Sequence, residues 1–168
     1  ELQVFADHRD EWEQRFSELY VVSHGPHFVR LCRDKAATMT ALEALDIGVP
    51  RTYYSPNSAK SANDFVSWPL IGKPVDGSSS IGIKDIASQA DFEQAVASNR
   101  LMIQEKVVGD EFTVNAYVGK DSEIKAIIPH RRVATRGGEV EKGIVEVLEG
   151  IEEITARLVS AHMDIRGP

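Results

Sequence analysis

The first candidates for chemistry in this sequence are a lysine and the loop that follows it, which is rich in glycine and serine. In WPLIGKPVDGSSSIGI, residues 68–83, the apolar pair Leu70 and Ile71 precedes Lys73 and then a run of glycines and serines. Glycine N–H groups and small hydroxyls can approach an anion, and the lysine adds positive charge, so the stretch suits a polyphosphate. It is not a Walker A loop, and a flexible surface loop beside a solvated lysine is the alternative.

A second candidate group lies in IQEKVVGDEFTVNAYV, residues 103–118. Glu105 ends an apolar run, and Glu111 follows after a short turn. A strand that ends at a bend leaves backbone donors and acceptors for the edge of a purine, and a carboxylate can accept hydrogen bonds from two ribose hydroxyls. The alternative is that both glutamates are solvated hairpin charges.

A third candidate is Lys35, which directly follows Asp34, the expected N-cap of a helix over 35–46. A cation in the first turn is slightly unfavourable because of the helix dipole, so we expect an anionic partner unless the lysine is simply solvated. The sequence has no convincing Ser/His/Asp or Cys/His set. Its five histidines show no paired metal-ligand spacing, so we assign no metal ligands.

The elements that position these residues indicate an α+β fold with antiparallel strand pairs. We expect helices over 9–19, 35–46, 57–64, 88–98 and 149–162. We expect strands over 19–23, 51–55, 69–73, 82–86, 101–108, 111–118, 123–130 and 143–147. Ser88 and Asp91 form a capping box, and the Gly119-Lys120-Asp121 turn joins two strands into a hairpin.

Composition narrows the classes of partner. The chain has 168 residues and a formal net charge of −7, which disfavours binding to nucleic acid or to anionic membrane surfaces. No apolar run approaches the roughly 20 residues of a membrane span. The single cysteine, Cys32, excludes an intrachain disulfide and fits a reducing, cytoplasmic compartment.

Taken in order, three stretches resemble successive motifs of the ATP-grasp superfamily. They are CRDKAATMTALEALDIGVPRTY, WPLIGKPVDGSSSIGI and MIQEKVVGDEFTV, and the resemblance covers about residues 30–168. HRRVATRGGEVEKGIVEV, residues 130–147, further resembles the carbamoyl phosphate synthase large-subunit-like branch, although that synthase itself tends to have arginine in place of Lys73. The resemblance implies two lobes, with antiparallel sheets flanked by helices, that clasp ATP.

The implied reaction transfers the γ-phosphoryl group of ATP to a small carboxylate substrate, and an amine or similar nucleophile then attacks the acyl phosphate. ATP-grasp proteins often pair, so a homodimer is compatible with the resemblance. The implied nucleotide-binding residues are Lys35, Ile71, Lys73, Ser78, Ser79, Ser80, Ile103, Glu105, Lys106, Val107 and Glu111.

Within this set, Lys35, Lys73 and the three serines would contact the phosphates. Residues 105–107 would form the adenine hinge. The two isoleucines would line the purine slot, and Glu111 would hold the ribose. Arg131 and Arg132 would contact the transferring phosphoryl group or the substrate carboxylate, because arginine makes bidentate pairs with either.

Family members end the catalytic lobe with carboxylates that hold Mg²⁺, whereas this sequence begins at Glu1 and stops at Pro168, before that segment would occur. We therefore expect a partial domain that is inactive alone, with Mg²⁺ bound only by the complete domain. The expected parts are residues 1–30 from a preceding domain, a linker helix at 31–50, a small lobe at 51–104 and part of the large lobe at 105–168. The alternative is a non-catalytic nucleotide-binding or interaction module with the same fold.

Overall fold

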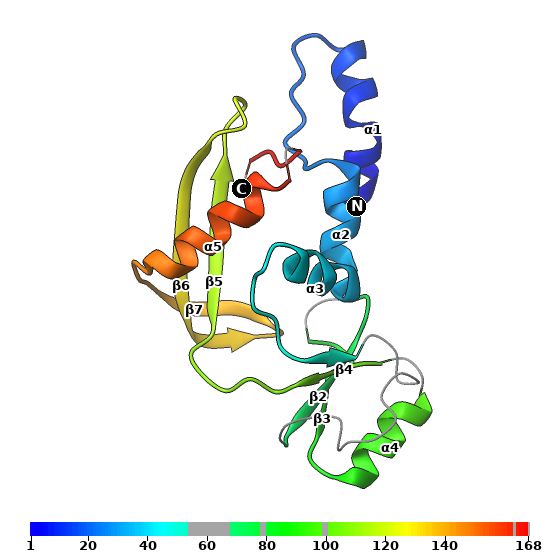
Figure 1. Cartoon of the computed structure of the whole chain (residues 1–168). Coiled ribbons are helices and arrows are strands. Elements are labelled where there is room, and N and C mark those ends of the chain that lie inside the picture. Colours follow the sequence, from blue (N-terminus) through cyan, green and yellow to red (C-terminus); the bar gives the residue numbers. More distant parts are fainter. Residues whose placement is uncertain (54–67, 78–79, 99–100, 163, 168) are drawn as a thin grey trace. The chain divides into compact units, whose positions relative to one another are not determined.

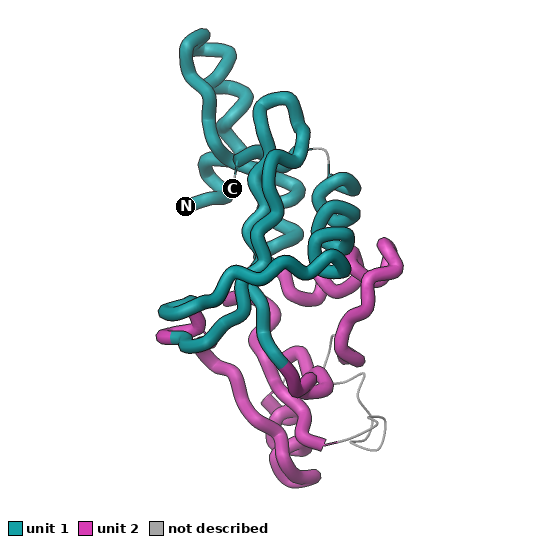
Figure 2. The backbone as a smooth tube through the Cα atoms, turned by 90° about the vertical axis from the view of Figure 1, so that its left-hand side faces the viewer, with its two compact units in different colours: residues 1–33, 110–135, 140–168 teal, residues 34–109, 136–139 magenta. Residues whose placement is uncertain are grey.

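The structure is a computed structural model of the whole chain, and it describes residues 1–53, 68–77, 80–98, 101–162 and 164–167. The chain divides into two compact units (Figure 2). Unit 1 comprises residues 1–33, 110–135 and 140–168, and unit 2 comprises residues 34–109 and 136–139. The fold is α+β, as the sequence predicts.

Unit 2 is built on a four-stranded antiparallel sheet with helices α3 (Lys35–Ala44) and α4 (Gln89–Ser98) (Figure 1). The strands are β1 (Thr52–Tyr53), β2 (Leu70–Pro74), β3 (Lys84–Ile86) and β4 (Leu101–Glu105), and their order in the sheet is β1-β4-β2-β3. β4 therefore lies between β1 and β2 and pairs antiparallel with both.

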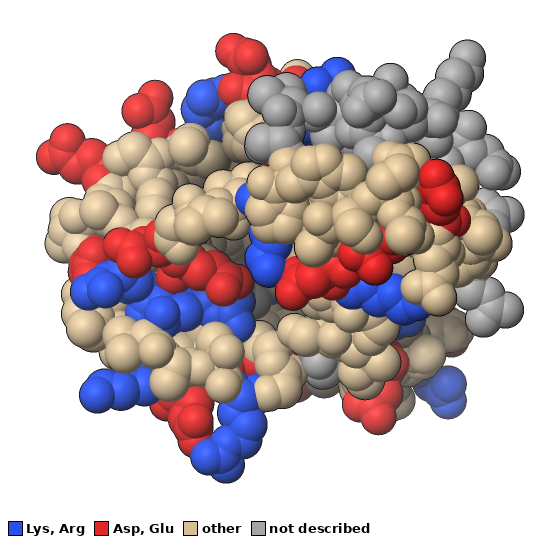
Figure 3. Space-filling view, turned by 90° about the horizontal axis from the view of Figure 1, so that it is seen from below, with Lys and Arg blue, Asp and Glu red and all other residues tan. Residues whose placement is uncertain are grey.

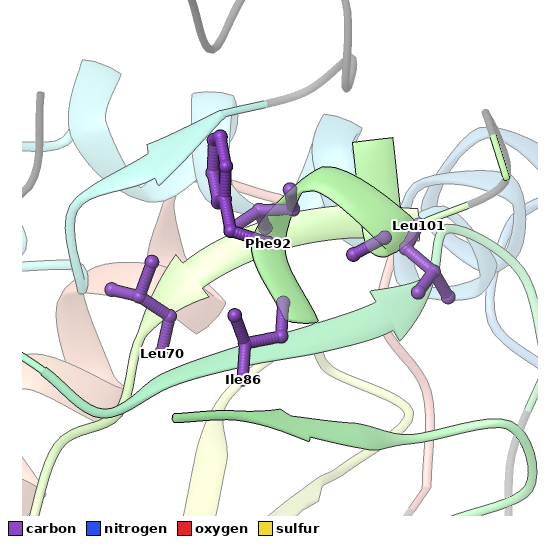
Figure 4. Close-up of a cluster of buried hydrophobic side chains, with 6 residues drawn as sticks. Leu70, Ile86, Phe92 and Leu101 are labelled. Atoms are coloured by element: carbon purple, nitrogen blue, oxygen red, sulfur yellow. The ribbon is translucent and has the colours of Figure 1, made fainter. Parts of the chain in front are cut away.

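One face of this sheet packs against α4 to form the core of unit 2 (Figure 4). Leu70 of β2 and Ile103 of β4 are fully buried. Both belong to one hydrophobic cluster that also includes Ile86 and Phe92. Each fully buried aliphatic or aromatic side chain contributes about 1.5–3 kcal/mol. This apolar face fixes which side chains of β2 and β4 point to the other side of the sheet.

Helix α4 begins with the predicted capping box. The Asp91 N–H donates to Ser88 Oγ at 3.2 Å, and the Ser88 hydroxyl donates to Asp91 Oδ2 at 2.7 Å. These bonds satisfy a free N–H at the helix start and lower the pKa of Asp91, chiefly through the Ser88 hydroxyl. The local sequence alone therefore determines where α4 begins.

Unit 1 combines three helices with a three-stranded antiparallel sheet. The helices are α1 (Leu2–Arg15), α2 (Pro26–Arg33) and α5 (Glu149–Ser160). The strands are β5 (Phe112–Val118), β6 (Ile124–Arg136) and β7 (Glu139–Val145), in the order β5-β6-β7; residues 136–139, at the β6–β7 turn, are assigned to unit 2. The hairpin predicted at residues 119–121 is confirmed.

Residues near the two ends of the chain are joined within unit 1. Arg9 is only 4% exposed, and its guanidinium donates to Asp164 Oδ1 at 2.7 Å and to the Ser23 carbonyl at 3.1 Å. The Gly25 N–H donates to the Asp164 carbonyl at 2.7 Å. Gly167 forms a two-hydrogen-bond bridge with Val118 at the end of β5.

The helices predicted over 35–46, 88–98 and 149–162 are confirmed to within a few residues. The strand predicted over 19–23 is wrong, since these residues form no strand and the Val21 N–H donates to the Glu13 carboxylate instead. Helix α2 was not predicted, although Pro26 at its first position is a typical start signal. The predicted helix at 57–64 and the end of the strand at 51–55 lie outside the described residues.

Among the described residues, no helix has both the length and the apolar character that crossing a membrane would require.

Candidate functional site

The face of the unit 2 sheet opposite α4 carries polar and cationic side chains. Gln104 of β4 pairs with Ile71 of β2 and with Thr52 of β1, and Lys73 pairs with Met102. Directly paired residues of antiparallel strands point to the same face, so these five side chains share one side of the sheet. The Lys73 ammonium donates to Gln104 Oε1 at 3.0 Å. The structure therefore places Ile71 and Lys73 on the same face of the sheet.

Ile103 does not lie with Ile71. Ile103 pairs with Gly72 and Tyr53, is fully buried, and belongs to the core cluster against α4. Side chains alternate between the two faces of a strand, so Ile103 and Gln104 point in opposite directions. The two isoleucines expected to line one purine slot therefore point to opposite faces of the sheet.

Gln104 is a site residue that the sequence reasoning missed. It is 3% exposed, and its amide nitrogen donates to Thr52 Oγ1 at 2.7 Å and to Met39 Sδ at 3.6 Å. A buried amide must have hydrogen-bond partners, because leaving it unpaired costs several kcal/mol. The available signal was one polar residue inside the apolar run LMIQE.

The backbone at the end of β4 is more fully paired than expected. The Glu105 N–H donates to the Arg51 carbonyl at 3.0 Å, and the Lys106 N–H donates to the Pro69 carbonyl at 3.3 Å. Both of these N–H groups are therefore paired with backbone carbonyls of unit 2. Val107 is 67% exposed, and within the described part of the chain its N–H has no backbone partner. Counting described residues only, Val107 has the first N–H of the bend without a backbone partner.

The side chains around this bend are mostly exposed, and both charged and apolar residues are among them. The Lys106 ammonium lies 2.7 Å from Asp85 Oδ1 of β3, and the Glu105 side chain is half-buried. Because Asp85 pairs with Ile71, the Lys106–Asp85 ion pair lies on the same face of the sheet as Lys73. Figure 3 shows basic and acidic side chains next to one another on one face of the molecule.

Lys35 is held beside the glycine-rich loop. Asp34 caps α3 as predicted, because its carboxylate accepts from the Ala37 N–H at 3.0 Å. The Lys35 ammonium donates to the Gly77 carbonyl at 2.8 Å, and the Lys35 N–H donates to the Val75 carbonyl at 3.0 Å. The partner of this ammonium is thus a carbonyl rather than the expected anion.

Of the three serines in the loop, Ser78 and Ser79 lie outside the described residues. Ser80 is exposed and has a left-handed backbone with φ of 57°. Gly77, with φ of 106°, also takes a conformation that favours glycine, so the described ends of the loop turn sharply.

Glu111 and Arg132 form an ion pair in unit 1, and the Arg132 N–H donates to the Glu111 carbonyl at 2.7 Å. Arg131 instead pairs with Glu146, whose carboxylate lies 2.7 Å from Arg131 Nε and raises the pKa of that guanidinium. Adjacent strand residues point to opposite faces. Arg131 and Arg132 therefore point to opposite faces of the sheet, and Arg132 is the one that shares a side with Glu111.

Within the described residues, no group of three or more His, Cys, Asp or Glu side chains is arranged to hold a metal ion. The cations of unit 2 are therefore the groups that could neutralise a polyphosphate there. Three of the described cations of this unit lie near the bend or the glycine-rich loop, or on the face of the sheet opposite α4, and they are Lys35, Lys73 and Lys106.

The ATP-grasp domain family matches residues 32–167 of the chain. A cyanophycin synthetase from Geminocystis herdmanii (strain PCC 6308) is 31% identical over 132 residues, which are 72% of this chain and 15% of that protein. A D-alanine–D-alanine ligase from Anaplasma marginale (strain Florida) is 24% identical over 119 residues, which are 67% of this chain and 36% of that protein. The chain thus spans well under half the length of these curated relatives.

Solved structures share the fold. D-alanyl-alanine synthetase A from Vibrio cholerae O1 biovar eltor str. N16961 has a TM-score of 0.70 and 19% identity, over 97% of this chain and 56% of that one. N5-carboxyaminoimidazole synthetase from Staphylococcus aureus complexed with ADP has a TM-score of 0.65 and 16% identity, over 89% of this chain and 42% of that one.

Proposed function

Because the chain belongs to the ATP-grasp domain family, we propose that it forms the ATP-binding part of a carboxylate ligase. In the proposed reaction, a carboxylate oxygen of the substrate attacks the γ-phosphorus of ATP and ADP leaves. An amine nitrogen then attacks the acyl carbon, phosphate leaves, and an amide forms. The relatives named above include two ligases or synthetases that join amino acids by name, and one solved neighbour holds ADP.

The observation that carries this proposal is the Lys73 ammonium on the face of the unit 2 sheet opposite α4, on the strand beside β4. Lys73 and Ile71 point to that face, and β4 ends in the bend where the Val107 N–H has no backbone partner among the described residues. An apolar surface, a cation and a free backbone donor are what an adenine nucleotide needs. Lys35 adds a second ammonium beside the glycine-rich loop.

Phosphoryl transfer depends on positioning and charge neutralisation more than on a nucleophilic side chain. The described residues of unit 2 offer lysines and, at Gly77 and Ser80, sharply turning ends of the glycine-rich loop, which fits that requirement. They offer no cluster of carboxylates that fits Mg²⁺, so we derive no step of the mechanism through that ion. The proposed role of this chain is to bind the nucleotide and to hold its phosphates.

Titration of the 168-residue chain with ATP, followed by calorimetry and by the melting temperature, tests the proposal. A ligand that binds only the folded state raises the melting temperature. Lys73→Met should lower the affinity for ATP about tenfold, since a hydrogen bond to a charged group contributes about 1.5–3 kcal/mol. The matched control is Lys142→Met, which removes an exposed lysine of β7 that has no proposed role.

Absence of any ATP-dependent change in the wild type would overturn the proposal, and equal affinities of the two lysine variants would remove Lys73 from the site. ATP consumption by the natural protein, in the presence of small carboxylates and amines, separates a ligase from a nucleotide-binding module without chemistry. Binding without consumption under any such mixture would favour the module.

Finer assignments are part of the same proposal. The stretch 130–147, which forms the end of β6, the β6–β7 turn and β7, supports the carbamoyl phosphate synthase large-subunit-like branch through its sequence alone. We also propose that the chain has the four expected segments and forms a homodimer. We further propose a cytoplasmic location and Mg²⁺ binding by a complete domain. A substrate screen with the natural protein would identify its carboxylate and its amine.

A further inference from the structure

We propose that Thr52 is a positioning residue, which orients the Gln104 amide so that its oxygen holds the Lys73 ammonium. The three residues come from three adjacent strands of the unit 2 sheet and form a continuous chain of hydrogen bonds. The consequence for nucleotide binding rests on the proposed function, whereas the orientation itself does not.

The direction of these hydrogen bonds is determined at the Thr52 end. The Thr52 hydroxyl lies 2.6 Å from the Pro50 carbonyl, which can only accept, so the hydroxyl must donate there. A hydroxyl has a single hydrogen, and its lone pairs are therefore what faces Gln104. Only the nitrogen of the Gln104 amide can donate to them, at 2.7 Å.

The other end gives the same answer independently. An ammonium has three donors and no acceptor, so Lys73 requires the amide oxygen of Gln104 at 3.0 Å. The second hydrogen of the Gln104 amide nitrogen points to Met39 Sδ of α3, at 3.6 Å. Both hydrogens of the amide nitrogen are thus used on the side away from Lys73, and the amide cannot rotate by half a turn without losing these bonds.

Such an arrangement matters because a lysine side chain is long and flexible. Fixing a lysine side chain in place costs about 2 kcal/mol of rotamer entropy. If the side chain is already held before a ligand binds, the binding free energy does not have to offset this cost. Thr52 is β-branched and restricted at χ1, so it is a rigid starting point. The neutral amide holds the ammonium without cancelling its charge.

The decisive variants are Thr52→Val, which keeps the shape and removes the hydroxyl, and Thr52→Ser, which keeps the hydroxyl. In Thr52→Val the Gln104 amide loses its acceptor and can turn its nitrogen toward Lys73, where two donors would repel. Thr135→Val is the matched control, because Thr135 is an exposed strand residue of β6 outside the site. Melting temperatures of all variants verify that they fold.

Two measurements separate the orientation from its consequence. The first is the rate at which limiting acetic anhydride modifies Lys73, with Lys142 of the same sample as the reference. We expect this rate to rise about fivefold in Thr52→Val, as for the loss of one hydrogen bond, and to stay at the wild-type value in Thr52→Ser and in the control. The second is the dissociation constant for ATP, which should rise by a similar factor in Thr52→Val alone.

An unchanged Lys73 modification rate in Thr52→Val would overturn the orienting role, whatever happens to ATP. A changed rate with unchanged ATP affinity would overturn the consequence for the nucleotide. A changed rate in a chain that binds no ATP even as wild type would support the orienting role and refute the proposed function.

Discussion

The ammonium of Lys35 donates a hydrogen bond of 2.8 Å to the carbonyl of Gly77, 42 residues further along the chain. The backbone adds a second link between the same segments, from the Lys35 N–H to the Val75 carbonyl at 3.0 Å. The first turn of α3 and the start of the glycine-rich loop are therefore held together from both the side chain and the main chain. This places a positive charge next to the loop before any ligand arrives.

Lys35→Met should weaken the binding of ATP about tenfold and leave the binding of adenosine nearly unchanged. The reason is that the lost charge acts on the phosphates and not on the base, and a hydrogen bond to a charged group contributes about 1.5–3 kcal/mol. Isothermal titration with both ligands measures the difference, and Lys142→Met is the control. Equal losses for ATP and adenosine would mean that Lys35 only supports the fold.

Gly25→Ala should destabilise unit 1 by about 1–3 kcal/mol, the usual cost of forcing an extra methyl group into a filled space. A Cβ at Gly25 would lie 1.5 Å from Asp164 Oδ2, so the Asp164 side chain would have to leave its hydrogen bond with Arg9. Urea unfolding followed by circular dichroism gives the free energy of unfolding.

Gly48→Ala is the matched control for this change, because a Cβ at Gly48 meets nothing within 4 Å. We expect it to be neutral or slightly stabilising, since alanine restricts the unfolded chain more than glycine does. If the two variants unfold at the same urea concentration, the contact between Gly25 and Asp164 has no importance for stability.

The parts of the fold that local sequence determines were predictable. The capping box at Ser88 and Asp91 gave the start of α4, and a three-residue turn gave the β5–β6 hairpin. Both depend on residues that are close in sequence, where propensity and hydrogen-bond chemistry act directly.

What the sequence could not give depends on pairing between distant residues. In LMIQE every side chain except that of Glu105 is buried, so the pattern has no alternation to show that Ile103 and Gln104 point to opposite faces. The partners of Gln104 lie 31, 52 and 65 residues away, so their contact follows only from the tertiary fold. The loss of a strand at 19–23 likewise follows from Glu13, which offers Val21 a side-chain partner instead.

Stability should fall as the pH is lowered from 7.5 to 5.5, in part through His24. Burial lowers the pKa of His24 and the nearby Arg9 lowers it further, while Asp164 opposes them. The unfolded chain therefore takes up a proton near the ordinary pKa of 6.5, before the folded state does, and unfolding is favoured as the pH falls through that value. Protonation also removes the acceptor of the Arg166 N–H, which lies 3.2 Å from His24 Nδ1.

The measurement is the free energy of unfolding at both pH values, for the wild type and for His24→Asn. Asparagine cannot titrate, and its side-chain oxygen can accept the hydrogen bond from Arg166, so the variant should show a smaller pH dependence. The interval stays above the ordinary carboxyl pKa values of 4.5 for Glu13 and 3.8 for Asp91, so these groups contribute little. An identical pH dependence in the two proteins would assign the effect to other groups.

Glu111→Gln should weaken ATP binding about five- to tenfold without changing the binding of 2′,3′-dideoxy-ATP. The proposed role of Glu111 is to accept hydrogen bonds from the two ribose hydroxyls, and a charged acceptor is stronger than an amide by roughly 1 kcal/mol. The Glu111 carboxylate is exposed and already paired with Arg132, so the hydroxyls must share it with that guanidinium. Glu153→Gln, an exposed glutamate of α5, is the control. Since the dideoxynucleotide lacks both hydroxyls, an equal loss for the two nucleotides would show that Glu111 acts through the Arg132 ion pair and not on the ribose.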